Sequence, residues 1–490
     1  MENNIAKIKP EIVWKNFYAL TQIPRPSKRE GKAIEFVKEF GEKLGLETIV
    51  DHVGNVIIKK PATKGMENRK GVILQGHVDM VPQKNSDKVH DFEKDPIEAY
   101  VDGDWVTANG TTLGADNGIG VAAAMAILES TDLVHGPIEG LFTMDEETGM
   151  TGANELKAGV LDGDILMNLD SEDEGELYIG CAGGINTSAT FDYQTESAPE
   201  DFKAFKISVT GLKGGHSGLD IPLKRGNANQ IMNRVLINAN EHYGLLLHKI
   251  DGGSLRNAIP RESFATVAVP NEEVDTFKSL AVEIEAYYKQ IITDDPGLKI
   301  IIEETTMPES FIDVETFDNL LNAIHFCPNG VINWLKDMPD VVETSTNLAI
   351  VKSGNGKIKV LSLQRSSVEE SKNALCDKLK ENFEKYGAKV EFSGEYPGWE
   401  PNTNSDILST MKEVYNNKYG KVPEVKVIHA GLECGILGAT YPNWDMISFG
   451  PTIRFPHSPD EKIKVDTVVK FWDYLVETLK NIPKKSSRGI

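Results

Sequence analysis

Short apolar runs that end in polar residues recur along the chain and predict the strands of a buried sheet. Four such runs cover residues 71–75, 138–144, 165–169 and 446–450. A further segment, residues 121–129, consists mainly of small apolar residues and predicts a buried helix. Continuous apolar runs are typical of strands that helices cover on both faces. The pattern therefore predicts an α/β fold.

Each predicted strand is followed by residues that can bind a metal ion. His77 and Asp79 follow the first run and lie on one face, because strand side chains alternate. The other candidates are Asp116 before the helix, Glu146 and Glu147 after the second run, Asp170 after the third, and His457 after the fourth. Taken singly, each has a structural explanation: a hydrogen-bonded histidine, a helix N-cap at Asp116, or acids in a solvated loop.

Taken together, these residues predict one site. Ligands of α/β sheets bind beyond the carboxyl ends of the strands, so residues distant in sequence converge there. The expected ligands are His77, Asp116, Glu147, Asp170 and His457. Their three carboxylates would repel one another without cations. Five ligands serve two divalent metal ions if one carboxylate bridges them, as in two-metal hydrolytic sites.

The order of these motifs resembles the di-zinc exopeptidase family that includes carboxypeptidase G, aminoacylase and the cytosolic dipeptidases. The matching motifs are His-x-Asp at 77–79, Gly-Ala-Asp-Asn-Gly at 114–118, Asp-Glu-Glu-Thr-Gly at 145–149, Asp170 and His457. Three segments, 113–120, 214–218 and 429–435, are similar to the aminoacyl-histidine dipeptidases within that family. The similarity spans nearly the whole chain, and no metal position departs from the family pattern.

The resemblance implies a role for each metal ligand. His77 and Asp170 would hold one zinc, Glu147 and His457 the other, and Asp116 would bridge both. It implies two divalent ions, with Zn²⁺ expected before Co²⁺ or Mn²⁺.

The resemblance also implies which groups assist the chemistry. Asp79 would orient the imidazole of His77. Glu146 would be the general base, since only one of two adjacent carboxylates can readily bind metal. The peptide bond between Asp116 and Asn117 is expected to be cis.

Substrate-binding roles follow from the same resemblance. His216, on the Gly-rich loop 214–218, would polarise the scissile carbonyl, although sequence alone permits an ordinary exposed histidine. Asn257 and Arg365 would bind the terminal carboxylate of the substrate or stabilise the oxyanion. Glu433 would receive the substrate's amino group.

The positions of these residues predict a discontinuous architecture. Four of the five ligands precede residue 171 and the fifth is His457. The resemblance implies a di-zinc aminopeptidase-like catalytic domain, with a mixed sheet between helices, at 1–185 and 400–490. Residues 186–399 would form an inserted α/β lid domain, with two α/β halves. Its expected strands lie at 204–209 and 357–363, each followed by a helix, at 228–240 and 368–386.

Composition restricts the partners and the compartment. The net charge of −22 argues against binding to nucleic acid or to an anionic membrane. The N-terminal segment lacks the features of a signal peptide, and the four cysteines show no Cys-x-x-Cys spacing. We expect a cytoplasmic protein. A homodimer through the lid domain is compatible with the resemblance. A nucleophile at Cys434, near His429 in sequence, is an alternative that the metal site makes unnecessary.

The expected activity is metal-dependent hydrolysis of dipeptides of the Xaa-His type, including β-Ala-His, and a broad dipeptide specificity is also compatible with the resemblance. Three alternatives remain: a deacylase, an aminotripeptidase, or a metal-binding homologue without catalytic activity. An acidic residue placed to bind a free amine would disfavour N-acetylated substrates. Retention of Glu146 beside Glu147 argues against the non-catalytic alternative, because metal binding requires no free base.

Overall fold

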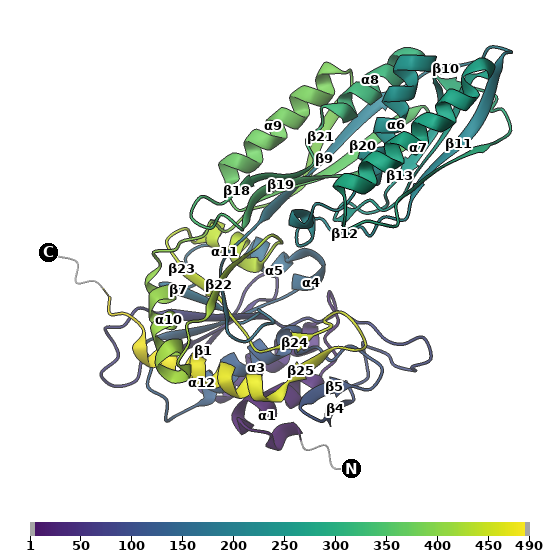
Figure 1. Cartoon of the computed structure of the whole chain (residues 1–490). Helices are drawn as coiled ribbons and strands as arrows, with labels where there is room; N and C mark the ends of the chain where they lie inside the picture. Colours follow the sequence, from purple (N-terminus) through teal and green to yellow (C-terminus); the bar gives the residue numbers. More distant parts are fainter. Residues whose placement is uncertain (1–4, 486–490) are drawn as a thin grey trace. The chain divides into compact units, whose positions relative to one another are not determined.

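The computed structural model describes residues 5–485 and divides into two compact units. Unit 1 contains the chain up to Gly180, Trp399–Val427, and the chain from Leu432 onward. Unit 2 contains Cys181–Gly398 and the short return Ile428–Gly431. The second unit is therefore an insertion in the sequence of the first (Figure 1).

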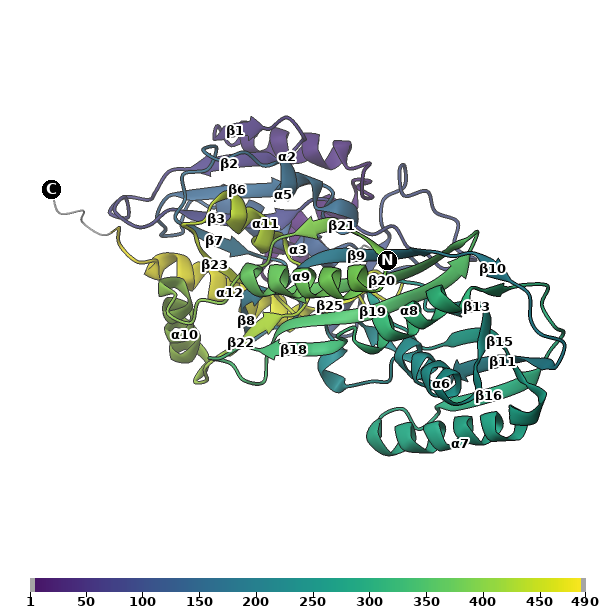
Figure 2. The same ribbon diagram turned by 90° about the horizontal axis from the view of Figure 1, so that it is seen from above.

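An eight-stranded mixed sheet forms the centre of unit 1, and Figure 2 shows its strands side by side. In spatial order the strands are β1 (Glu47–Val50), β2 (Val56–Lys60), β6 (Ile138–Thr143), β3 (Val72–His77), β7 (Ile165–Asn168), β23 (Asp445–Ser448), β8 (Glu176–Cys181) and β22 (Glu424–Ile428). The four strands β6, β3, β7 and β23 run parallel, and each coincides with a predicted apolar run. Their carboxyl ends therefore meet at one edge of the sheet.

The helices of unit 1 are α1 (Glu11–Thr21), α2 (Gly31–Lys43), α3 (Ala115–Glu129), α4 (Glu146–Gly149), α5 (Thr151–Glu155), α10 (Asp406–Tyr419), α11 (Glu433–Thr440) and α12 (Val465–Asn481), with a 3-10 turn at Ile5–Lys7. Of these, α1, α2, α3, α10 and α12 supply side chains to the apolar core that packs on the sheet. Helix α3 contains the predicted helix 121–129 and is buried along nearly its whole length among α1, β3 and β6. Its small residues allow this close packing on all sides.

A four-stranded sheet accompanies the central one in unit 1. It joins β4 (Ala99–Asp102) and β5 (Trp105–Ala108) to β25 (Lys462–Lys464) and β24 (Ile453–Arg454). This sheet fixes the segment that carries His457, which lies between β24 and β25.

Unit 2 is built on a nine-stranded sheet whose pairings are antiparallel. Its strands are β16 (Lys299–Glu304), β11 (Phe202–Thr210), β15 (Ser263–Pro270), β13 (Leu246–Gly252), β19 (Val342–Gly354), β20 (Lys357–Ser366), β9 (Gly183–Asp192) and β21 (Lys389–Tyr396), with β18 (Gly330–Trp334) paired to β19. Only two residue pairs join β13 to β19, so two groups of strands meet there. The expected strands at 204–209 and 357–363 are β11 and β20.

Four helices pack with this sheet into the apolar core of unit 2: α6 (Ala228–Tyr243), α7 (Val274–Ile291), α8 (Val314–His325) and α9 (Glu369–Lys385). Short pairings β10 (Thr195–Glu196) with β17 (Phe311–Ile312), β12 (Gly215–His216) with β14 (Ala258–Ile259), and 3-10 turns at Ile221–Leu223 and Asn271–Glu273 complete the unit. Across residues 5–485, none of the helices combines the length and apolar character needed to cross a bilayer.

Candidate metal centre

The polar ends of the parallel strands meet because the strands are in register. His77, the last residue of β3, is paired with Thr143 of β6, two residues before Asp145. Gln75 of β3 is paired with Asn168 of β7, two residues before Asp170. The sheet itself therefore brings the segments after β3, β6 and β7 to one place.

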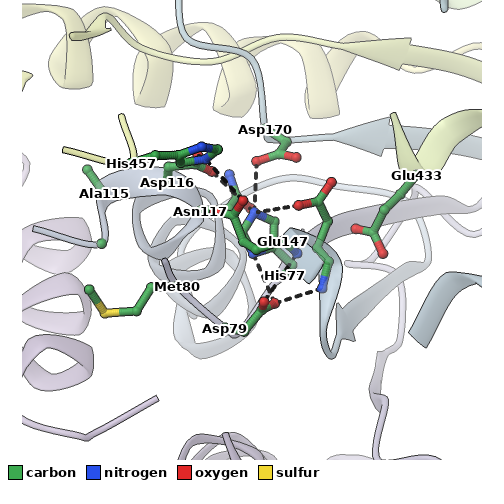
Figure 3. A network of polar contacts seen from close by, with 12 residues as sticks. His77, Asp79, Met80, Ala115, Asp116, Asn117, Glu147, Asp170, Glu433 and His457 are labelled. Carbon is green, nitrogen blue, oxygen red and sulfur yellow. Dashed lines mark hydrogen bonds and ion pairs between the residues drawn. The ribbon is translucent and has the colours of Figure 1, made fainter. Parts of the chain in front are cut away.

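Three groups of donor atoms could each hold a metal ion, and two of them share the carboxylate of Asp116 (Figure 3). The third group is His77, Glu146 and Glu147. His77 Nε2 lies 3.2 Å from Asp116 Oδ1 and 3.4 Å from Asp170 Oδ1. His457 Nε2 lies 3.1 Å from Asp116 Oδ2 and 3.0 Å from Glu147 Oε2. All five residues expected as ligands are thus brought together, and the two oxygens of Asp116 face different imidazoles.

The chemistry of these donors fits divalent metal ions. Glu147 Oε1 is buried and accepts no hydrogen bond within the described structure. Hydrogen bonds that His457 donates to the carboxylates of Asp116 and Glu147 raise its pKa to about 11. Burial lowers the pKa of His77, but Asp170 and Asp116 raise it well above the ordinary value. Both imidazoles thus carry positive charge among the buried carboxylates. Bound metal ions would supply positive charge at the same place.

Asp79 connects the first imidazole to the glutamate pair. Its Oδ1 lies 3.3 Å from His77 Nδ1, as expected for a residue that orients the ring. The same carboxylate accepts the backbone N–H groups of Glu146 at 3.0 Å and Glu147 at 3.3 Å. Although burial opposes it, the interaction with His77 and the hydrogen bonds from the N–H of Glu146 and the hydroxyl of Ser27 lower the pKa of Asp79 to about 2. The contact of Asp79 with the backbone of Glu146 and Glu147 was not predicted from the sequence.

The turn that carries the glutamates is fixed by Asp145, whose role the sequence did not reveal. Asp145 is 2 % exposed and has a positive φ of 51°. Its carboxylate accepts hydrogen bonds from the hydroxyls of Thr148 and Thr151. These bonds compensate a backbone conformation that non-glycine residues rarely adopt.

Glu146 lies beside the metal-binding atoms without sharing their closest contacts. Its Oε2 is 4.0 Å from His77 Nε2, and its side chain is 15 % exposed. Burial raises the pKa of Glu146 well above the ordinary value, and the neighbouring acids Asp170 and Glu433 add to this effect. A raised pKa suits a carboxylate that takes up and returns a proton near neutral pH.

Glu433 belongs to a buried polar row that crosses the parallel strands. Its Oε2 accepts hydrogen bonds from Gln75 Nε2 at 2.6 Å and Thr143 Oγ1 at 2.9 Å. The row continues because Asn168 Nδ2 donates to Gln75 Oε1 at 2.6 Å, and Ser448 Oγ donates to Asn168. Glu433 Oε1 is buried and has no hydrogen-bond partner among the described residues. One carboxylate oxygen is thus held while the other remains available.

The loop before α3 differs from a simple helix cap. Gly114 occupies the N-cap position with φ 70°, and the backbone of Asp116 is non-helical, so the cap explanation for Asp116 is wrong. The peptide bond between Asp116 and Asn117 is cis, as the resemblance implied. The carboxylate of Asp116 faces the two histidines instead of the helix amides.

A buried arginine that the sequence did not reveal supports this loop. Arg25, 1 % exposed, donates to the carbonyl oxygens of Val78, Asp79 and Gly114 at 2.6–3.0 Å. A Cβ atom at Gly118 would lie 2.5 Å from the guanidinium. The glycines of this motif therefore make room for Arg25. Their presence is the only sign of the role of Arg25 in the sequence.

The remaining predicted residues surround one loop of unit 2. His216 Nδ1 accepts the backbone N–H groups of Gly218 and Leu219, so a neutral ring carries its proton on Nε2. Burial and the nearby Arg365 lower the pKa of His216. Arg365 Nη1 donates to Tyr396 Oη at 2.9 Å, and the carbonyl of Asn257 accepts the N–H of Ser217 at 2.8 Å. His216 is therefore held as a neutral hydrogen-bond donor.

Comparisons with known proteins point to one family of peptidases. The model of peptidase family M20/M25/M40 matches residues 73–481. The chain is 43% identical over 484 residues to the cytosol non-specific dipeptidase of Escherichia coli (strain K12), covering 99% of this chain and 100% of that protein.

Two solved structures are similar over nearly the whole chain. One is an aminoacylhistidine dipeptidase from Vibrio alginolyticus, with a TM-score of 0.95, 47% identity and 99% of each chain covered. The other is an aminopeptidase from Bacillus cereus, with a TM-score of 0.57 and 17% identity, covering 97% of this chain and 99% of that chain. The second likeness concerns the fold alone.

Proposed function

The chain belongs to peptidase family M20/M25/M40 and is a dipeptidase, and from this premise we propose that it hydrolyses Xaa-His dipeptides, including β-Ala-His, with two divalent metal ions. The observation that carries the proposal is the placement of Asp116. Its Oδ1 faces His77 at 3.2 Å, and its Oδ2 faces His457 at 3.1 Å. A carboxylate that turns one oxygen to each donor group is suited to bridge two ions.

The proposed ligand sets are His77, Asp116 and Asp170 for one ion, and Asp116, Glu147 and His457 for the other. When bound, the two ions would supply Lewis acidity towards water and the substrate carbonyl. Zn²⁺ is the ion we propose, before Co²⁺ or Mn²⁺, because imidazole and carboxylate ligands suit it.

Protein groups would move the proton and orient the donors. Glu146 would take the proton of the attacking water and return it to the leaving amine. Asp79 would hold the ring of His77 and, through the N–H groups of Glu146 and Glu147, the position of both glutamates. A single carboxylate thus sets the spacing between a ligand and the base.

Recognition of both substrate ends would restrict cleavage to short peptides. Glu433 would bind the substrate's ammonium group, since one of its oxygens is buried without a partner in the described structure. In unit 2, Arg365 and Asn257 would bind the terminal carboxylate, and His216 would donate its Nε2 proton to the scissile carbonyl. We assign unit 1 as the catalytic domain and unit 2 as the lid.

The cellular setting is part of the proposal. A cytoplasmic location is supported by the cytosol dipeptidase that the chain resembles. A homodimer through unit 2 remains a proposal that sedimentation would test. The net charge of −22 supports the expectation that neither nucleic acid nor an anionic membrane is a partner.

A panel of four substrates tests the function. Purified protein is assayed on β-Ala-His, Leu-Leu, Gly-Gly-Gly and N-acetyl-Met, with and without chelator. We expect cleavage of the two dipeptides, little cleavage of the other two, and loss of all activity on chelation. Preferred cleavage of Gly-Gly-Gly would indicate an aminotripeptidase, and preferred cleavage of N-acetyl-Met a deacylase. Full activity in protein shown to be metal-free by elemental analysis would refute the metal mechanism.

A further inference from the structure

The carboxylate of Glu461 binds four consecutive backbone amides. Oε2 accepts the N–H groups of Leu113 at 2.8 Å and Gly114 at 3.0 Å. Oε1 accepts those of Ala115 at 2.7 Å and Asp116 at 3.2 Å. Glu461 is 2 % exposed, and the bonds span about 345 positions in sequence. An acid in this position stabilises a loop that would otherwise leave four buried N–H groups unsatisfied.

The loop is shaped to present these amides to one acceptor. The positive φ of 70° at Gly114 turns successive N–H groups towards a common point, as in other anion-binding nests. On the other side of the loop, Arg25 Nη2 donates to the carbonyl oxygen of Gly114 at 2.6 Å. The backbone that precedes Asp116 is thus held from both sides.

Glu461 also fixes the segment that carries His457. The N–H of Glu461 donates to the carbonyl of Ser458 at 2.9 Å, which closes a turn next to His457. Its own carbonyl accepts the hydroxyl of Thr107 at 2.7 Å. His457 itself has a positive φ of 59° and a side chain that is 53 % exposed. The exposed imidazole therefore depends on its backbone segment for its position.

We propose that Glu461 is a positioning residue that sets the spacing between His457 and Asp116, and that it thereby controls the affinity of one of the two metal ions. This inference rests on the proposed two-metal function. The ion concerned is the one held by Asp116, Glu147 and His457. Glu461 touches neither the ion nor the substrate and acts through the two backbone segments that carry Asp116 and His457.

Loss of Glu461 should weaken only one metal ion, because the donor group of the other ion is held in place by different contacts. His77 is the last residue of β3 and is 1 % exposed, and its ring is held by Asp79. Asp116 is also restrained from its C-terminal side, where Asn117 Nδ2 donates to the carbonyl of Leu169 at 2.7 Å. Loss of Glu461 would therefore displace His457 relative to Asp116 more than His77 relative to Asp116.

Three variants separate the proposal from a general loss of stability. In Glu461→Gln, the amide nitrogen must face two backbone N–H groups, so two of the four bonds are replaced by donor–donor contacts. Glu461→Asp retains the charge and should restore part of the effect. The matched control is Glu139→Gln: Glu139 is 5 % exposed and accepts the N–H groups of Asp162 and Gly163 at the far end of β6.

The experiment measures metal binding by the apoprotein. Co²⁺ is titrated into metal-free wild type and variants by calorimetry, and the bound ion is counted by equilibrium dialysis. We expect two ions in the wild type and in Glu139→Gln. In Glu461→Gln, one ion should bind about 10–100-fold more weakly, the range for loss of a residue that supports a ligand. The other ion should keep its affinity within about threefold, and Glu461→Asp should be intermediate.

A His457→Ala background identifies which ion is affected. Adding Glu461→Gln to His457→Ala should weaken metal binding no further, because both changes act on the same ion. Unchanged affinities in Glu461→Gln, equal weakening of both ions, or additive effects in the double variant would overturn the proposal. Failure of Glu461→Asp to fold would overturn it too, by assigning Glu461 a purely structural role. A wild type that binds no metal would instead refute the proposed function.

Discussion

Replacement of Glu433 by glutamine tests how the substrate's amino group is recognised. Gln75 and Thr143 hold Glu433 Oε2, whereas Oε1 has no partner among residues 5–485. An ammonium group at this oxygen would form a buried ion pair. Glutamine keeps the shape of the side chain but removes the negative charge, so the variant isolates the electrostatic part of recognition.

The magnitude follows from Coulomb's law. Two unit charges about 4 Å apart interact with about 4 kcal/mol at an effective dielectric constant of about 20. This energy corresponds to about 10³-fold in kcat/KM, since about 1.4 kcal/mol is tenfold. The assay is run at about pH 8, because burial raises the pKa of Glu433 to about 7 and the carboxylate must be ionised.

A comparison of two substrates makes the test specific. Each protein is assayed with a dipeptide and with its des-amino analogue, in which hydrogen replaces the ammonium group. Wild type should prefer the dipeptide by about 10³-fold, and Glu433→Gln by less than about tenfold. Glu139→Gln, which alters a buried carboxylate away from the site, should retain the wild-type preference. An undiminished preference in Glu433→Gln would refute the assignment.

Three further outcomes are expected. Glu146→Gln should keep both metal ions and lose about 10²–10⁴-fold in kcat, whereas Glu147→Gln should also lose metal, as measured by elemental analysis. The reverse result would exchange the assignments of general base and metal ligand. His216→Ala should lower kcat with metal content unchanged, by about 2.7–4 kcal/mol of transition-state stabilisation, and wild-type turnover would exclude His216 from catalysis. Burial, with Arg365 and His216 nearby, lowers the pKa of His429 to about 3, below its unfolded value of about 6.5, so the folded state binds fewer protons. The stability that the neutral ring contributes is complete above about pH 6.5 and falls by up to about 1.4 kcal/mol per pH unit below it. A histidine NMR titration should find His429 neutral at about pH 5, and a protonated ring there would contradict this account.

The α/β fold class could be predicted because apolar runs report burial directly. The runs at 71–75, 138–144 and 165–169 correspond to β3, β6 and β7, and the small-residue segment 121–129 lies within α3. Each strand is buried on both faces, so nearly every position had to be apolar. Two of the exceptions, Gln75 and Asn168, are members of the polar row.

The residues that support the site could not be predicted in the same way. Arg25 and Glu461 act on backbone atoms far away in sequence, and a backbone atom leaves no residue-specific signal at its own position. Asp145 acts within its own turn, but an acid beside two other acids suggests a solvated loop. Asp116 was open to explanation as a cap because its contacts with His77 and His457 depend on the tertiary fold.

The place of β23 in the central sheet bears on how the protein is made. β23 lies between β7 and β8, although β7 ends at Asn168 and β23 begins at Asp445. During synthesis, the ribosome must therefore release the whole of unit 2 before the centre of the unit 1 sheet can close. Domains generally fold as they emerge, so unit 2 would be able to fold while β7 still lacks its neighbour. An intermediate of this kind exposes a strand edge that attracts other strands. The nascent chain is therefore most open to aggregation between the release of β7 and the release of β23.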